Sequence, residues 1–282
     1  MPGVSFDRAA NYYDATRGYT EGVAERIRDA LTDHIGATVT TRFLELGVGT
    51  GRIALPFIQA GYNYTGIDLS RAMLNVLQTK LRQPGAGVRL RAWLCQADVT
   101  DLPFAAATFE VILGVHVLHL VNDWQQALRE ARRVLHPSGA WMILGYDEGL
   151  REPGDLDRSE SLPPPLQAQK TWNSILKEMG YGARTGRSRI QISDERLHTH
   201  FHELGATTEA VCLTTYARPA ISARDVVNRY RERIYSSDWN RPDDIHNEAI
   251  RRIERWLATE CAAPDEPATE MGQFTVLIAH WD

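Results

Sequence analysis

The sequence contains little cysteine and little lysine, and it has no long apolar run. Its three cysteines, Cys95, Cys212 and Cys261, lie far apart, which excludes a disulfide framework and predicts a reduced, cytoplasmic protein. An uninterrupted apolar stretch of about 18 residues, which a membrane span requires, is missing. The opening residues, 1–8, lack the basic-then-apolar order of an export signal, so we expect no export.

Basic residues are also fewer than acidic residues. Lysine and arginine together number 31 against 36 acidic residues, which gives a formal net charge of −5. An acidic balance argues against nucleic acid or an anionic membrane surface as a partner. The 282 residues and the ordinary apolar content of 43% instead predict one large packed domain with insertions.

Strand-like and helix-like segments alternate in the first half of the chain. The expected strands are 42–47, 62–68, 88–96, 109–115 and 139–147. The expected helices between them are 52–61, 71–82 and 124–135. Alternation of this kind predicts βαβ units, and therefore a parallel sheet with helices on both faces.

The pattern changes after residue 147. We expect helices at 166–179, 194–204, 223–236 and 245–260, and two more strands at 207–217 and 273–281. This predicts N-terminal helices over 1–40, a sheet core over 41–147, and 148–282 as the rest of the same domain. The inserted helices around the last two strands are expected to cap the carboxyl edge of the sheet.

A glycine turn is the most informative motif. The first expected strand runs directly into Gly47, Gly49 and Gly51, and a helical pattern follows. Glycines at this spacing let the backbone turn tightly and lie against a ligand, because no Cβ intervenes. The helix start adds unpaired N–H groups, so a ligand is expected here.

Acidic residues recur at the ends of the first three strands. Glu45 lies within the first, Asp68 ends the second, 21 residues after Gly47, and Asp98 follows the third. The carboxyl ends of these strands converge on one crevice in a doubly wound sheet. Asp68 can accept hydrogen bonds from ribose hydroxyls, and Asp98 with the backbone N–H of Val99 can meet the edge of an adenine. Together these residues predict an adenosine pocket.

Residues 43–147 resemble class I S-adenosylmethionine-dependent methyltransferases of the small-molecule, UbiE/methyltransferase-11-like type. The stretches that carry the resemblance are 44–51, 66–74, 96–104, 109–119 and 127–139. The resemblance implies a doubly wound, seven-stranded, mostly parallel α/β sheet, a Rossmann-like methyltransferase fold with inserted cap helices, whose last strand is antiparallel. Residues 6–17 are also similar to the leading helix of this family, which folds over the cofactor.

The resemblance implies S-adenosyl-L-methionine as the cofactor and assigns it a set of contacts. Glu45 and the backbone near Gly47 and Gly114 would hold its methionine part, with Gly49 and Gly51 permitting close approach. Leu69 and Met73 would line the adenine, beside the ribose contact of Asp68 and the adenine-edge contacts of Asp98 and Val99. Arg17 would pair with the methionine carboxylate, and Tyr12 or Tyr13 would approach the methyl group, where Tyr13 is also a catalytic candidate.

Methyl transfer from a sulfonium needs chiefly a positioned acceptor and the exclusion of water. A base is useful where the acceptor must lose a proton, and His116 and His119, just past the fourth strand, are candidates. We expect a small-molecule acceptor, a monomer or homodimer, no nucleic-acid or membrane partner, and no metal. His198 and His202 share a helix face, but no cysteine or convergent carboxylate accompanies them.

Three other functions fit the sequence less well. A nicotinamide-dependent oxidoreductase is disfavoured because Arg52 stands where the dinucleotide fingerprint needs a small residue. A nucleic-acid methyltransferase would carry a Pro-Cys pair or an Asp/Asn-Pro-Pro-aromatic motif, and neither is present. A non-catalytic module that binds the cofactor remains an alternative, although the glycines and acids are intact.

Overall fold

The computed structural model describes residues 6–83, 92–149, 162–181 and 192–282. The chain divides into two compact units. The first, here called the sheet unit, comprises Met1–Glu148, Ile190–Tyr216 and Gln273–Asp282. The second, the helical unit, comprises Gly149–Arg189 and Ala217–Gly272.

The sheet unit is built on a single sheet that has seven strands in the described residues, in the order β3-β2-β1-β4-β5-β7-β6. The strands are β1 (Arg42–Leu46), β2 (Asn63–Asp68), β3 (Ala92–Gln96), β4 (Val111–Val115), β5 (Ala140–Gly149), β6 (Thr207–Ala217) and β7 (Met271–Trp281). The pairs β1/β2, β1/β4, β2/β3 and β4/β5 are parallel. The order reverses between β1 and β4, which brings their carboxyl ends together at the site of the glycine turn.

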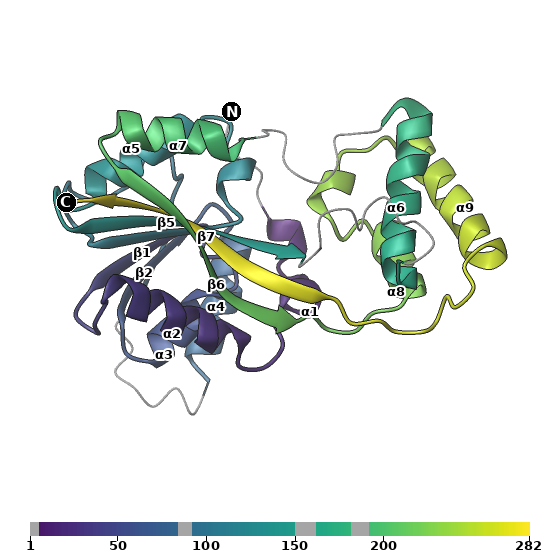
Figure 1. The fold of residues 1–282 in the computed structure, drawn as a ribbon, viewed down its shortest axis with the longest axis horizontal. Helices are drawn as coiled ribbons and strands as arrows, with labels where there is room; N and C mark the ends of the chain where they lie inside the picture. The colour runs from purple at the N-terminus through teal and green to yellow at the C-terminus, as the bar shows by residue number, and fades with distance from the viewer. Residues whose placement is uncertain (1–5, 84–91, 150–161, 182–191) are drawn as a thin grey trace. The chain divides into compact units, whose positions relative to one another are not determined.

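Strand β7 runs opposite to its neighbours (Figure 1). Its last residues lie beside the start of β5, where the N–H of Gly139 donates to the carbonyl of Trp281 at 2.6 Å. They also lie beside the start of β6, where the Thr207 hydroxyl donates to the His280 carbonyl at 3.4 Å. The expected seven-stranded, mostly parallel sheet is therefore confirmed.

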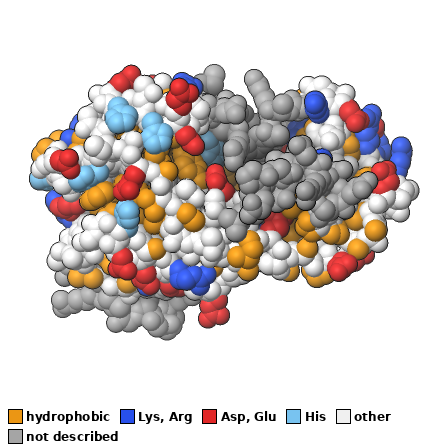
Figure 2. Space-filling view, in the orientation of Figure 1, with side chains coloured by type: hydrophobic (Ala, Val, Ile, Leu, Met, Phe, Trp, Pro, Cys, Tyr) orange, Lys and Arg blue, Asp and Glu red, His pale blue; other side chains and the backbone are white. Residues whose placement is uncertain are grey.

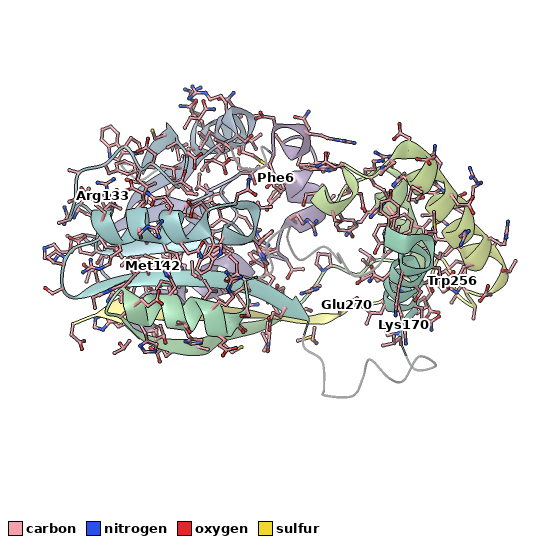
Figure 3. All side chains as sticks on the ribbon, turned by 90° about the horizontal axis from the view of Figure 1, so that it is seen from above. Phe6, Arg133, Met142, Lys170, Trp256 and Glu270 are labelled. Atoms are coloured by element: carbon pink, nitrogen blue, oxygen red, sulfur yellow. The ribbon has the colours of Figure 1, made fainter. Side chains whose placement is uncertain are left out.

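Helices cover both faces of this sheet (Figure 1). One face carries α5 (Trp124–Val134) and α7 (Asp194–Glu203); the other carries α2 (Val23–Ile35), α3 (Ala54–Gln59) and α4 (Arg71–Leu81). Side chains of β1 alternate between two cores: Leu44 and Leu46 pack on the α5 side, and Phe43 on the α2 side. Met142 of β5 lies in the core under α5 (Figure 3).

The N-terminal segment differs from the single helix expected over 6–17. It forms a short 3₁₀ helix, η1 (Asp7–Ala9), and one separate helical turn, α1 (Tyr13–Arg17). Helix α1 ends where Gly18 leaves the helical region and its N–H donates to the Asp14 carbonyl at 2.8 Å. Residues 10–12 separate the two pieces.

The helical unit has its own core. Within the described residues its helices are α6 (Pro164–Leu176), the π-helical turn η4 (Lys177–Tyr181), α8 (Ala223–Arg231), η5 (Ser236–Asp238) and α9 (Asp243–Thr259). Lys170 and Trp256 mark α6 and α9 in Figure 3. The helix expected over 223–236 ends at Arg231, because Arg233 adopts a left-handed φ of 52° and the N–H of Ile234 returns to the Arg229 carbonyl at 3.0 Å.

Other element boundaries shift by a few residues from those expected. Residues 88–91 of the expected strand 88–96 lie outside the described residues, and β3 begins at Ala92. The three cysteines carry free thiols. In the described parts of the chain, we find no helix that combines the length and apolar character of a membrane span.

Candidate functional site

The glycine turn follows β1 with positive φ at each of its three glycines. A Cβ on Gly51 would overlap Leu77 of α4, so this glycine is required by packing of the turn on that helix. A Cβ on Gly49 would meet nothing closer than 4.0 Å, which leaves this stretch of backbone facing open space. A Cβ on Gly47 would lie 2.7 Å from Val117 Cγ2, so the turn is pressed against the loop after β4.

The carboxylate of Asp68 lies at the end of β2 and binds the glycine turn directly. Its Oδ2 accepts from the N–H of Gly49 at 2.8 Å, and its Oδ1 accepts from the N–H of Ser70 at 2.7 Å. Burial raises the pKa of Asp68, and the two backbone N–H groups oppose this shift. Since each carboxylate oxygen has two lone pairs, both oxygens can still accept from a ligand hydroxyl.

Glu45 is more deeply enclosed in β1, where its side chain is 2% exposed. Its Oε2 accepts a hydrogen bond from the Tyr64 hydroxyl at 2.7 Å. Burial raises the pKa of Glu45 to about 8, although the Tyr64 hydroxyl and the charge of Arg52 act in the opposite direction. A group with this pKa can donate or accept a hydrogen bond near neutral pH.

The expected adenine-lining residues flank the start of α4. Ser70 caps this helix by accepting from the N–H of Met73 at 3.2 Å, and Met73 is buried. Leu69 is half-buried, and its carbonyl accepts from the Gln96 side chain at 3.0 Å. The cap therefore fixes both residues beside the end of β2.

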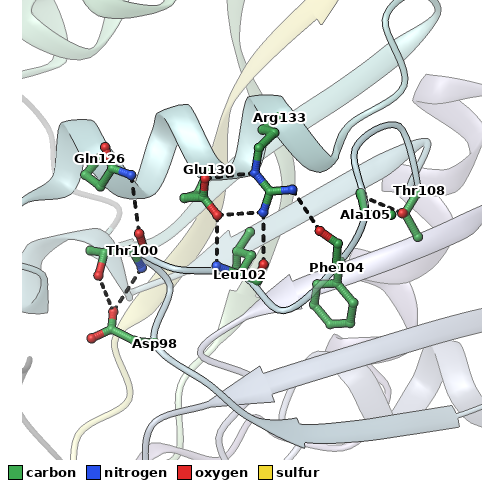
Figure 4. A network of polar contacts seen from close by, with 9 residues as sticks. All are labelled: Asp98, Thr100, Leu102, Phe104, Ala105, Thr108, Gln126, Glu130 and Arg133. Carbon is green, nitrogen blue, oxygen red and sulfur yellow. Dashed lines mark hydrogen bonds and ion pairs between the residues drawn. The ribbon is translucent and has the colours of Figure 1, made fainter.

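The loop after β3 carries Asp98 and Val99. Asp98 Oδ1 accepts from both the N–H (2.9 Å) and the hydroxyl (2.8 Å) of Thr100, which closes the turn, and Val99 is buried. Helix α5 holds the rest of this loop through Gln126, Glu130 and Arg133, which bond its backbone at Thr100, Leu102 and Phe104 (Figure 4). These contacts within the chain thus hold the loop in place.

The N-terminal segment is tied across these strand ends at several points. Ser70 donates to Asp7 at 2.5 Å, and Asp14 accepts from the Thr50 hydroxyl at 2.6 Å and pairs with Lys80 at 2.7 Å. The carbonyl of Arg17 accepts from the Arg52 guanidinium at 3.2 Å. The segment therefore runs along the glycine turn and the start of α4.

The two expected tyrosines lie on this segment. Tyr13 packs edge-on against Phe6, with ring centroids 6.3 Å apart. The Tyr12 hydroxyl is buried and finds no hydrogen-bond partner among the residues that the structure describes. A buried hydroxyl without a partner is unfavourable, so a polar ligand atom beside it would relieve a cost of about 1–3 kcal/mol.

The loop after β4 holds the histidines. Gly114 ends the part of β4 that pairs with β1, and His116 follows with a left-handed φ of 52°. His119 lies in the 3₁₀ helix η2 (Leu118–Leu120), with its ring centroid 6.4 Å from that of His116. Burial, together with the neighbouring His116, lowers the pKa of His119 to about 4, so its ring is neutral at neutral pH.

The sequence reasoning missed one residue of this site, Asp147 on β5. Its carboxylate pairs with Arg52 and His116, both at 2.8 Å, and accepts from the hydroxyls of Tyr19 at 2.7 Å and Tyr216 at 2.6 Å. Burial alone would raise the pKa of Asp147, but Arg52 and His116 outweigh it and hold the pKa well below its usual range. The sequence signal that could have found Asp147 is Arg52, a charge that needs a partner if buried.

Two other features lie apart from the glycine turn. A groove of about 390 Å³ opens between Trp93, Phe104 and Phe109, and its lining includes Arg42 and Asn63 at the opposite, amino ends of β1 and β2. Several histidines are spread over the face shown in Figure 2. Among the described residues, no group of three or more histidine, cysteine or acidic side chains is placed to hold a metal ion.

The sheet core of the chain is similar to known proteins. Residues 44–143 match the sequence model of the family described as "Methyltransferase domain". A demethylmenaquinone methyltransferase from Renibacterium salmoninarum is 32% identical over 142 residues, which are 50% of this chain and 56% of the relative. The ubiquinone/menaquinone biosynthesis C-methyltransferase UbiE from Dinoroseobacter shibae is 30% identical over 166 residues, 56% of this chain and 66% of the relative. The chain thus spans less than two thirds of the length of these relatives.

A solved structure supports the fold. Phosphoethanolamine N-methyltransferase 2 from Haemonchus contortus, in complex with phosphomonomethylethanolamine and S-adenosylhomocysteine, aligns with a TM-score of 0.53 and 15% identity. The alignment covers 98% of this chain and 57% of that chain. At this identity the likeness establishes the fold alone. The expected similarity of residues 44–143 to a methyltransferase domain and the expected Rossmann-like fold are confirmed, while the roles of single residues stay predictions.

Proposed function

On the premise that residues 44–143 form a methyltransferase domain, we propose that the chain is an S-adenosylmethionine-dependent methyltransferase that acts on a small molecule. The observation that carries the proposal is the hydrogen bond between Asp68 and Gly49, 2.8 Å long. It joins the carboxylate at the end of β2 to the open backbone of the glycine turn. A ribose held by Asp68 would therefore lie beside a backbone that no side chain covers.

The residues present fit S-adenosylmethionine. Gly49 offers a bare backbone surface to the methionine part, and the unpartnered hydroxyl of Tyr12 offers a polar contact. We assign the ribose to Asp68 and the adenine edge to Asp98 and Val99. When bound, this cofactor supplies an electrophilic methyl group on a sulfonium, which needs no further activation.

The other proposed contacts surround these. The remaining cofactor-binding residues are Tyr13, Arg17, Glu45, Gly47, Gly51, Leu69, Met73 and Gly114. An arginine suits the methionine carboxylate because its planar fork can donate two parallel hydrogen bonds. Tyr13 is assigned to the region of the reacting methyl group.

A small-molecule acceptor agrees with the net charge of −5, which does not favour nucleic acid. The relatives above are named for quinone biosynthesis, which makes cyclic hydroxyl-bearing compounds a sensible first panel. We propose His116 or His119 as the base where the acceptor must lose a proton. A cytoplasmic location and a monomeric or homodimeric state complete the proposal.

The test is a screen for S-adenosylhomocysteine release. The protein is incubated with S-adenosylmethionine and a panel of phenols, quinols, amines and thiols, and products are identified by mass spectrometry. We expect one class to gain a methyl group at a rate that depends on protein concentration. Binding of S-adenosylhomocysteine with no methylation of any class would favour a non-catalytic binding module instead.

A further inference from the structure

The carboxylate of Asp147 is held in place from four sides. Arg52 comes from the glycine turn, Tyr19 from the N-terminal segment, His116 from the loop after β4 and Tyr216 from β6. The Asp147 side chain is 12% exposed, so its charge is largely withdrawn from water and depends on these donors. Such a carboxylate is ionised and has a fixed orientation.

The Nε2 atom of His116 faces two groups of Asp147 that make opposite demands. The carboxylate Oδ2 lies 2.8 Å away and requires Nε2 to donate a proton. The backbone N–H of Asp147 lies 3.0 Å away and would require Nε2 to accept one. A charge-assisted bond is roughly twice as strong as a neutral one, so the ionised carboxylate decides the outcome. His116 then carries its proton on Nε2.

This tautomer leaves a lone pair on Nδ1. In the described part of the chain, the hydrogen bonds found for the His116 ring are made by Nε2, and the His116 side chain is 32% exposed. Its left-handed backbone, rare for a residue with a Cβ, turns the residue out of β4. A strained backbone at a strand end beside a ligand-binding turn is the setting in which functional side chains are found.

His119 does not have the same support. His119 is half-buried, burial and the neighbouring His116 lower its pKa to about 4, and its ring centroid lies 6.4 Å from that of His116. The remaining ring that packs near His116 is Tyr146 of β5, edge-on at 6.2 Å. Among the described residues, the titratable groups that the structure places against His116 are Asp147, Tyr146 and His119, and Arg52 pairs with the same oxygen of Asp147.

We propose that Asp147 is a positioning residue that fixes the Nε2–H tautomer of His116, so that Nδ1 receives the proton of the methyl acceptor. This inference rests on the proposed function. As the acceptor's lone pair forms its bond to the methyl carbon, the electrons of the S–C bond stay on sulfur and the acceptor's proton passes to Nδ1. The resulting imidazolium lies beside the negative charge of Asp147 and releases its proton to solvent.

The tautomer can be measured directly. Long-range ¹H–¹⁵N spectra of protein labelled at its nine histidines report which ring nitrogen carries the proton, and a His116→Gln variant assigns the signals. We expect neutral His116 to be protonated at Nε2. In Asp147→Ala the carboxylate is lost and the backbone N–H of residue 147 still faces Nε2, so the proton should move to Nδ1. Asp147→Asn should restore the original tautomer, because an amide oxygen can take the place of Oδ2.

Tyr216→Phe is the matched control, since it removes one bond to Asp147 and leaves His116 untouched; its tautomer should not change. A wild-type His116 ring protonated at Nδ1 would overturn the proposal, even if Asp147→Ala does not fold.

The catalytic role has a kinetic test. With an acceptor from the screen, His116→Gln should lower kcat by about 10²–10⁴-fold and leave KM for S-adenosylmethionine unchanged. An unchanged kcat would overturn it as well. Failure to bind S-adenosylhomocysteine would instead contradict the proposed function.

Discussion

The guanidinium of Arg52 lies 2.8 Å from the carboxylate of Asp147, and its Cζ lies 4.5 Å from the ring centroid of Tyr19. Arg52 directly follows the last glycine of the turn, so this pair ties the turn to the end of β5 and to the N-terminal segment. At this position, where a dinucleotide fingerprint needs a small residue, Arg52 instead forms an ion pair whose side chains are only 15% and 12% exposed.

Replacing Arg52 with methionine should destabilise the fold by about 3–5 kcal/mol, because it leaves the charge of Asp147 buried without its counter-charge. Urea unfolding measures the change. Arg42→Met is the matched control, since Arg42 and Glu110 form a pair whose side chains are 41% and 35% exposed. A pair this exposed is worth about 0–1 kcal/mol. Equal losses in the two variants would contradict the assigned role of Arg52.

Two glycines of the turn should respond differently to alanine. Gly51→Ala should cost about 2–5 kcal/mol of stability, because it combines a left-handed backbone with an overlap on Leu77. Gly49→Ala should lose only the stability that the left-handed backbone accounts for, about 1–2 kcal/mol, but it should also weaken cofactor binding. Thermal unfolding and calorimetric titration separate the effects. The double variant Gly51→Ala/Leu77→Ala tests the cause. If its loss of stability equalled the sum of the losses in the two single variants, the overlap between residue 51 and Leu77 would not be the cause.

Asp68→Ala should weaken S-adenosylhomocysteine binding by about 10–100-fold, as expected for loss of charged hydrogen bonds worth about 1.5–3 kcal/mol. Calorimetric titration gives the affinity. Asp33→Ala, at the far end of α2, keeps the change in net charge the same and should leave the affinity unaltered. Equal affinities of wild type and Asp68→Ala for S-adenosylhomocysteine would contradict the assignment of the ribose to Asp68.

Glu45 predicts a pH dependence of stability. Burial raises its pKa from 4.5 to about 8, so the folded protein binds a proton that the unfolded chain has lost between these values. Its stabilising contribution is therefore full at low pH and falls as pH rises through this range, by up to about 1.4 kcal/mol per pH unit. Glu45→Gln should remove the fall, so its stability relative to wild type should grow with pH. Urea unfolding at several pH values measures this.

The control for this prediction is Glu25→Gln on α2, where the side chain is exposed. Its stability relative to wild type should stay level from about pH 5 to about pH 8. A Glu45→Gln curve parallel to that of wild type over the same range would show that Glu45 is ionised in the folded protein throughout.

Local pattern was enough to predict the parallel strands and the order of the loops at their carboxyl ends. Strands such as β4, Val111–Val115, are apolar and mostly buried, and turn residues mark their ends. Asp68 could be placed because it closes a strand with a clear boundary. The early end of α8 could not be predicted from the sequence. It depends on the left-handed backbone of Arg233, and no helix-breaking residue marks it.

The Asp147 cluster shows what local pattern cannot supply. Its partners Tyr19, His116 and Tyr216 lie 128, 31 and 69 residues away in sequence. No spacing rule links them, since they meet only after β4, β5 and β6 take their places in the sheet. Asp147 itself appeared in the sequence only as the last residue of an expected strand.

A calorimetric titration of the full chain with S-adenosylhomocysteine, with NADH titrated under the same conditions, tests the proposed cofactor directly. We expect saturable binding of one S-adenosylhomocysteine per chain and no binding of NADH. Absence of any heat with S-adenosylhomocysteine, or binding of NADH in its place, would contradict the proposed cofactor.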